Sequence, residues 1–132
     1  MNKFRKKIIA GNWKMNKNVA EAIDLVEAIK CDLAQTREVE VVVCPPFTAT
    51  KACSDSLADT EIKLGAQNMH WEKNGAYTGE VSAEMLRELF CHYVIVGHSE
   101  RRQYFAENDT FINEKVIFAK RDCLLINFFS IF

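Results

Sequence analysis

The stretch YVIVGHSERRQY, from Tyr93 to Tyr104, decides the fold. Its first four residues are apolar and predict a short buried strand. Gly97 permits a sharp turn, and His98, Ser99 and Glu100 follow where a helix is expected to begin. In α/β proteins, side chains just beyond the carboxyl end of a strand commonly perform chemistry. An imidazole, a hydroxyl and a carboxylate at this point therefore indicate a functional site.

The same alternation of a short apolar strand and an amphipathic helix recurs along the chain. Further strands are expected at 7–10, 39–44 and 62–66, and helices at 19–33, 48–57, 82–90 and from 109 or 110 to 120. Ser82 suits the N-cap of the third of these helices, and Asp109 or Thr110 that of the last. On the last helix we expect Phe111, Ile112, Val116 and Ala119 to form the apolar side. Linkers this short force parallel strands packed under helices, so the expected fold class is α/β.

Composition excludes several classes of protein. A chain of 132 residues with 48% hydrophobic residues suits one globular domain. A net charge of −1 gives no reason to expect nucleic acid or an anionic membrane as a partner. Five cysteines without a C-x-x-C pair fit reduced thiols in a cytoplasmic protein better than a disulfide framework. Neither a secretory signal nor an apolar run of about 20 residues is visible, so no membrane anchor is expected.

Polar side chains follow three of the expected strands and should meet at one edge of the sheet. They are Asn12, Lys14, Gln67, Asn68, His98 and Glu100. Such a set suits an anionic, oxygen-rich substrate and proton transfer. Taken singly, Lys14 could be a solvated lysine and Glu100 a helix-capping residue, and His98 could simply bond to backbone.

Metal and nucleotide sites are not expected. The spacing from His98 to Glu100 matches the first half of a zinc deaminase motif, but the P-C-x-x-C half is missing. No Gly-rich nucleotide loop is present. An open flavodoxin-like binding module is a weak alternative, because no phosphate loop follows the first strand.

Five motifs make the interpretation specific. They are AGNWKMN (10–16), CPPF (44–47), GAQN (65–68), GAYTGEVSAEML (75–86) and VGHSERR (96–102). In this order they resemble the triosephosphate isomerase family, from about residue 7 to about 120. The resemblance implies the first half, about four β/α repeats, of a (β/α)₈ barrel, which needs about 250 residues when complete. The whole chain, 1–132, is then expected to be a single incomplete barrel domain.

The resemblance implies a reaction and roles for four residues. The family interconverts dihydroxyacetone phosphate and glyceraldehyde 3-phosphate, a step of glycolysis and gluconeogenesis, through an enediolate and without metal or organic cofactor. Lys14 would hold the phosphate and stabilise the enediolate, with Asn12 positioning it. His98 would polarise the carbonyl as a neutral imidazole, for which this family is the established example. Glu100 would pair with Lys14.

The resemblance also implies a homodimer. The loop 67–80 resembles the arm that enters a partner subunit, with Thr78 near the partner's site and Met15 in the docking area. The family's general base, a glutamate after the sixth strand, and its lid and last phosphate loops lie beyond the resemblance. The chain alone is therefore expected to be inactive.

Residues 121–132, RDCLLINFFSIF, depart from the family and are expected to form an atypical apolar tail. An interrupted reading frame or a truncated copy would produce such a tail. Phe128, Phe129, Ile131 and Phe132 are expected near an open sheet edge, which favours aggregation. The alternative hypothesis is a non-catalytic half-barrel that self-associates to close an eight-stranded barrel.

Overall fold

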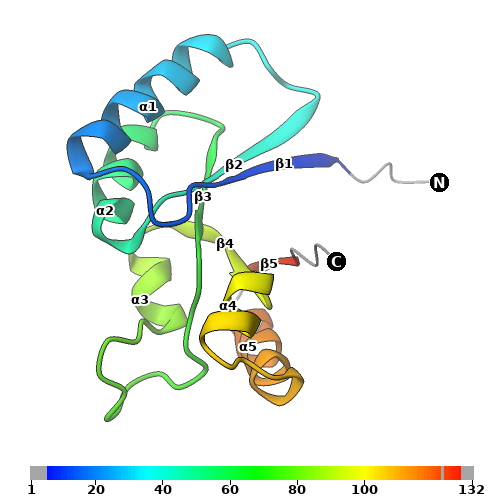
Figure 1. Ribbon diagram of the computed structural model, residues 1–132. Coiled ribbons are helices and arrows are strands. Elements are labelled where there is room, and N and C mark those ends of the chain that lie inside the picture. The colour runs from blue at the N-terminus through cyan, green and yellow to red at the C-terminus, as the bar shows by residue number, and fades with distance from the viewer. Residues whose placement is uncertain (1–5, 123, 129–132) are drawn as a thin grey trace, which may run out of the picture. The chain divides into compact units, whose positions relative to one another are not determined.

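The computed structural model describes residues 6–122 and 124–128 (Figure 1). Five strands form one sheet in which their order follows the chain, β1-β2-β3-β4-β5. The pairs β1–β2, β2–β3 and β4–β5 are parallel, which confirms the expected parallel α/β architecture. By contacts, the chain divides into two compact units, Met1–Leu64 and Gly65–Phe132, and β3 (Lys63–Ala66) crosses that boundary. The single-domain expectation stays a prediction.

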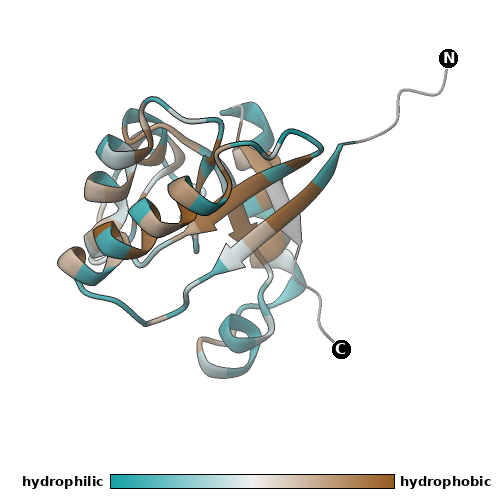
Figure 2. Cartoon of the chain, turned by 90° about the horizontal axis from the view of Figure 1, so that it is seen from above, coloured by the Kyte–Doolittle hydropathy of each residue, from teal (hydrophilic) through white to brown (hydrophobic). Residues whose placement is uncertain are grey.

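The first unit is a β-α-β-α segment. It comprises β1 (Lys7–Asn12), α1 (Val19–Asp32), β2 (Val39–Cys44) and α2 (Phe47–Leu57). Both strands run in register over their whole length, which places Ile8 beside Glu40 and Ile9 beside Val41. The middle of β1 is hydrophobic, and Figure 2 shows it brown beyond the teal start of the strand next to the N-terminal trace.

The helices of the first unit begin where the sequence supplies a stop or a cap. The Asn18 side chain accepts from the Glu21 N–H at 3.0 Å, and the Glu21 carboxylate accepts from the Asn18 N–H at 2.9 Å, a capping box. Pro45 directly follows the last residue of β2, and Pro46 occupies the N-cap position of α2. The two helices contact each other, and the Ser56 hydroxyl donates to the Glu27 carboxylate between them.

The second unit carries the remaining elements. They are α3 (Ala83–Glu88), β4 (Cys91–Val96), α4 (Ser99–Tyr104), α5 (Asp109–Arg121) and β5 (Leu125–Phe128). Part of the expected tail is therefore a fifth strand, parallel to β4 with Tyr93 opposite Leu125. Hydrophobic periodicity cannot show whether so short an apolar run forms a strand or an irregular tail. The expectations for Phe129, Ile131 and Phe132 lie outside the described residues.

Two helix starts test the expected caps. Ser82 caps α3 by accepting from the Met85 N–H at 3.3 Å, as predicted. The expected caps of α5 are wrong, because Asn108 occupies that position and accepts from the Phe111 N–H at 2.9 Å. Asn is as good a cap as Asp, so composition alone does not separate adjacent candidates. No helix in the part of the chain described is both long and apolar enough to span a bilayer.

Candidate functional site

The first group of predicted site residues follows β1 in the first unit. Lys14 has φ +55°, a left-handed conformation that costs a residue with a side chain about 1–2 kcal/mol. The Asn12 side-chain oxygen accepts from the Lys14 N–H at 3.0 Å, and the Trp13 N–H donates to the Cys44 carbonyl at 3.1 Å. These two bonds fix the turn on which Lys14 stands, and strained backbone held in this way is typical of functional sites.

The second group follows β4 in the second unit. Gly97 has φ +74°, a left-handed conformation that favours glycine, whereas a Cβ there would make only an ordinary contact with Ile112 Cγ2 at 3.4 Å. The Arg102 Nε donates to the Gly97 carbonyl at 3.3 Å and holds the turn from the helix that follows. The turn delivers His98, only 7% exposed, to the N-cap position of α4.

The imidazole of His98 is oriented by the start of α4. Its Nδ1 accepts from the Glu100 N–H at 3.2 Å. A ring nitrogen that accepts a hydrogen bond carries no proton, so a ring in this geometry is neutral with its proton on Nε2. His98, and not Glu100, therefore caps α4. Glu100 lies in the first turn of that helix, and its Oε2 is 3.7 Å from His98 Nδ1.

The ion pair expected between Lys14 and Glu100 stays a prediction, because Lys14 belongs to the first unit and Glu100 to the second. The same holds for the meeting of all six polar residues at one edge. The Glu100 side chain is 42% exposed. Gln67, which follows β3, is half-buried, and Asn68 is turned into a buried network.

The motifs and strand positions in the sequence do not predict this buried polar network of the second unit. Lys115 on α5 donates to Asn68 Oδ1 at 2.8 Å and to Glu107 Oε1, and Arg101 Nε donates to Glu107 Oε1 at 2.6 Å. Lys115, Glu107 and Asn68 are 4%, 7% and 7% exposed. Glu107 Oε2 is buried without a partner among the described residues.

The charges of the network determine how Glu107 titrates. Burial works to raise the pKa of Glu107, but the hydrogen bonds and charges of Lys115 and Arg101 outweigh it and lower the pKa. Burial lowers the pKa of Lys115, and the hydrogen bond to Glu107 opposes this shift.

The helical spacing of the sequence predicts that Lys115 is buried, because it lies on the same side of α5 as Ile112 and Ala119. Phe111, expected on that side, is 42% exposed instead.

The loop that resembles a dimer arm is internally packed. His70 stacks on Trp71 with ring centroids 4.3 Å apart and lies 4.2 Å from the Tyr77 ring. The His70 N–H donates to the Val81 carbonyl at 2.8 Å, which closes the base of the loop. Thr78 is exposed on it.

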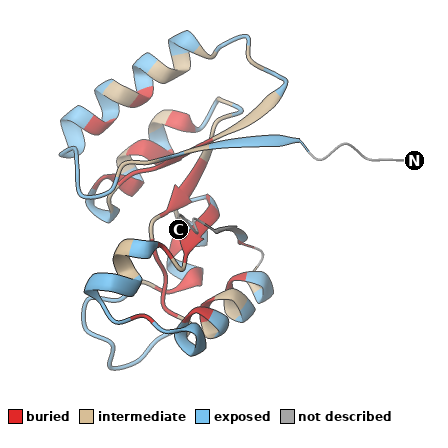
Figure 3. Cartoon of the chain, turned by 45° about the vertical axis from the view of Figure 1, so that its right-hand side comes forward, coloured by how far each residue is buried: buried red, intermediate tan, exposed pale blue. Residues whose placement is uncertain are grey.

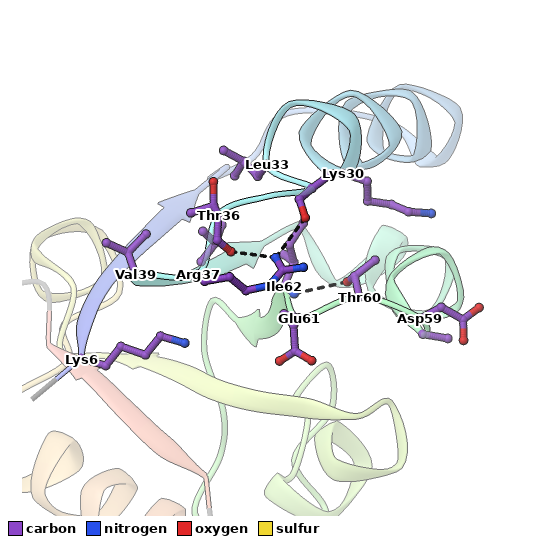
Figure 4. Close-up of a pocket in the computed structure, with 13 residues that line it drawn as sticks. Lys6, Lys30, Leu33, Thr36, Arg37, Val39, Asp59, Thr60, Glu61 and Ile62 are labelled. Carbon is purple, nitrogen blue, oxygen red and sulfur yellow. Dashed lines mark hydrogen bonds between the residues drawn. The ribbon is translucent and has the colours of Figure 1, made fainter.

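A groove of about 690 Å³ lies at the amino-terminal end of β2, and Lys14 is not among its lining residues (Figure 4). Its lining is apolar in part, at Leu33, Val39, Val41, Ala58 and Ile62, and carries Lys6, Lys30, Arg37, Asp59 and Glu61. Arg37 Nη1 donates to the carbonyls of Ala34 and Thr36, both at 3.0 Å. Ligands of parallel sheets bind at the opposite, carboxyl ends, so this groove is not part of the candidate site.

The sequence of this chain matches one protein family over most of its length. The family model described as triosephosphate isomerase matches residues 7–126. The chain is similar to the triosephosphate isomerases of Alkaliphilus metalliredigens and Alkaliphilus oremlandii, 60% and 62% identical over 113 residues. Each match covers 86% of this chain and 45% of the relative.

A solved structure agrees with the sequence matches. The crystal structure of triosephosphate isomerase from Bartonella henselae is similar with a TM-score of 0.87 and 39% identity. The match covers 94% of this chain and 51% of that one. The expected first half of a (β/α)₈ barrel is thereby confirmed, and the chain spans about half the length of the relatives it matches.

Proposed function

Because the chain belongs to the triosephosphate isomerase family, we propose that it carries one half of an active site that interconverts dihydroxyacetone phosphate and glyceraldehyde 3-phosphate. The matched relatives bear the name of that enzyme. The chain covers less than half of their length, so the activity of the complete protein is a proposal here.

The geometry of His98 is the observation that carries the proposal. An imidazole with Nδ1 bonded to the Glu100 N–H presents its proton on Nε2. A neutral N–H donor can polarise a substrate carbonyl and then exchange its proton with the oxygens of an enediolate. In this relay Nε2 gives its proton to one oxygen and takes a proton back from the other, while Nδ1 stays bonded to the Glu100 N–H. His98 would therefore act as electrophile and proton relay.

Lys14 would bind the phosphate dianion and stabilise the negative charge of the enediolate. Its ammonium is a compact point charge suited to a dianion. The Asn12 side chain fixes the Lys14 backbone at 3.0 Å and so directs the lysine stem. Glu100 would pair with Lys14 and hold its ammonium group in place.

The proton-abstracting base is not among these residues. In the family it is a glutamate after the sixth strand, beyond the matched segment 7–126. A positioned general base contributes about 10²–10⁴ in rate. We therefore expect the 132-residue chain alone to bind substrate weakly and not to isomerise it.

We also propose a cytoplasmic homodimer through the loop 67–80. Met15 is 95% exposed, an unusual position for a large apolar side chain unless a partner covers it. Thr78, on the loop 67–80, is exposed. The aromatic stack around His70 supports the proposal, because it gives the loop a defined shape before docking.

Nuclear magnetic resonance of the labelled chain tests the proposed roles. The ¹⁵N shifts of His98 should report a proton on Nε2. Dihydroxyacetone phosphate should shift the His98 signals. Lys14→Met should weaken that response at least about tenfold, and Lys51→Met, a surface lysine of the same unit, should not. Equal effects of the two substitutions would refute the site.

A further inference from the structure

The groove at the amino-terminal end of β2 has an apolar floor that is only partly covered. All of its lining residues belong to the first unit. Its larger aliphatic side chains are half-buried, namely those of Leu33, Val39, Val41 and Ile62, and Figure 3 shows the first half of β2 in the colour of half-buried residues. A volume of about 690 Å³ lies in the usual range of small-molecule sites, about 300–1,000 Å³. The groove can therefore take the apolar body of a small molecule.

The two loops that wall the groove are held in defined shapes. In the loop after α1, the Thr36 N–H donates to the Leu33 carbonyl at 2.9 Å. In the loop after α2, the Thr60 hydroxyl donates to the Leu57 carbonyl at 2.9 Å and accepts from the Ile62 N–H at 3.3 Å. Binding between these loops needs little further ordering of the chain, which favours affinity.

Arg37 presents a guanidinium group of fixed orientation to this groove. Its Nη1 donates to the carbonyls of Ala34 and Thr36, both at 3.0 Å, and Figure 4 shows both bonds as dashed lines. These bonds cover two carbonyls at the end of α1 that would otherwise repel an anion. Because the guanidinium is planar, they also fix the plane in which Nε and Nη2 donate. Two N–H groups along one edge of a guanidinium match the two oxygens of a carboxylate.

The other charges of the groove favour a ligand with a single negative charge. Lys6 lines the groove from the β1 side, whereas Lys30 is already paired with Glu27 at 2.9 Å. Asp59 and Glu61 line the loop after α2, and Figure 4 shows their carboxylates directed away from the guanidinium. A second negative charge on the ligand, as in a phosphate monoester, would be repelled by these two carboxylates.

We propose that this groove binds an apolar monocarboxylate, whose carboxylate accepts from Nε and Nη2 of Arg37. The apolar body would lie against Val39, Val41 and Ile62. Such a site would be independent of the isomerase reaction, because its lining contains none of the six polar residues that follow the strands.

Titration of the ¹⁵N-labelled chain with 4-phenylbutyrate tests the proposal. This probe joins one carboxylate to an apolar body. The amide signals of the loops 33–38 and 58–62 should shift and saturate. Two control compounds should each bind at least about tenfold more weakly, since 4-phenylbutanol has the same body without the charge and butyrate has the charge without the ring.

Matched substitutions locate the carboxylate and the body. Arg37→Met should raise the Kd of 4-phenylbutyrate at least about tenfold and leave that of 4-phenylbutanol within about threefold. Lys51→Met removes one positive charge from the same unit outside the groove and should change neither Kd. Val41→Thr should weaken both compounds, because it places a hydroxyl against the apolar body.

Four results would overturn the proposal. They are signal changes centred on His98 instead of the two loops, equal binding of 4-phenylbutyrate and 4-phenylbutanol, equal effects of Arg37→Met and Lys51→Met, and unchanged binding of both compounds by Val41→Thr. A titration that does not saturate up to about 10 mM would overturn it as well.

Discussion

Replacing Lys115 by methionine should cost the second unit about 3–5 kcal/mol of stability, the usual effect of removing one partner from a buried ion pair. Methionine keeps the apolar stem of the side chain but removes the ammonium group. Asn68 Oδ1 then loses a donor at 2.8 Å, and Glu107 keeps only Arg101. Hydrogen bonds to charged groups are worth about 1.5–3 kcal/mol each, so the two lost bonds account for the estimate.

Urea unfolding followed by Trp71 fluorescence in a Trp13→Phe background reports the second unit. At an m value of about 2 kcal/mol/M, the urea midpoint of Lys115→Met should fall by about 1.5–2.5 M. A variant that does not fold at all would also agree with the expected loss of stability. The control is Lys51→Met, which breaks a surface pair with Asp55 whose side chains are 67% and 65% exposed. It should cost at most about 0.5 kcal/mol. A loss below about 1 kcal/mol for Lys115→Met would refute the reasoning.

Two further measurements separate the ion pair from simple packing. The double variant Lys115→Met, Glu107→Leu should recover much of the loss, because it leaves no uncompensated buried charge. The lowered pKa of Glu107 stabilises the fold above its unfolded value, near 4.5, and this contribution disappears as the pH falls through the folded pKa. The difference between the wild-type chain and Lys115→Met should therefore shrink below about pH 4.5. A pH-independent difference would assign the effect to packing.

Three further predictions follow from the turns, caps and thiols. Gly97→Ala should cost at least about 1–2 kcal/mol in urea unfolding because φ is +74°, whereas Gly11→Ala, with ordinary contacts from 3.6 Å, should cost under about 1 kcal/mol. Asn108→Ala should cost about 1 kcal/mol by loss of the α5 cap, and an unchanged midpoint would contradict that assignment. Iodoacetamide should modify exposed Cys31 in the folded chain but spare Cys91, whose pKa burial raises to about 12; peptide mass mapping that finds them equally modified would contradict the fold.

The order and type of the elements followed from local patterns in the sequence. The β-branched run Val39–Cys44 and its terminating prolines predicted β2 with its observed bounds. β4 begins two residues before the expected Tyr93, at Cys91. Leu125–Phe128 became a strand because β4 offered it an edge, a tertiary cause that no window of local sequence contains.

The residues of the candidate site could be picked out from the sequence, whereas the buried network around Lys115 could not. Its residues came from motifs and from their position after strands. The structure describes the turns at Lys14 and His98, and the roles that the motifs imply stay predictions. The buried network was missed because a single lysine in an apolar stripe has no visible partner in the sequence. Its partner Glu107 lies eight residues earlier, in the loop before α5, so only folding brings the charges together.

The torsion angle at Lys14 has a consequence for engineering. A backbone at φ +55° is suited to glycine, and stabilising searches that compare sequence preference with backbone shape would mark this lysine for exchange. Such an exchange should raise thermal tolerance slightly while it deletes the ammonium group to which the proposed function assigns phosphate binding. Stability and chemistry thus make opposite demands on one residue, and a more robust version of this fold has to gain its stability elsewhere.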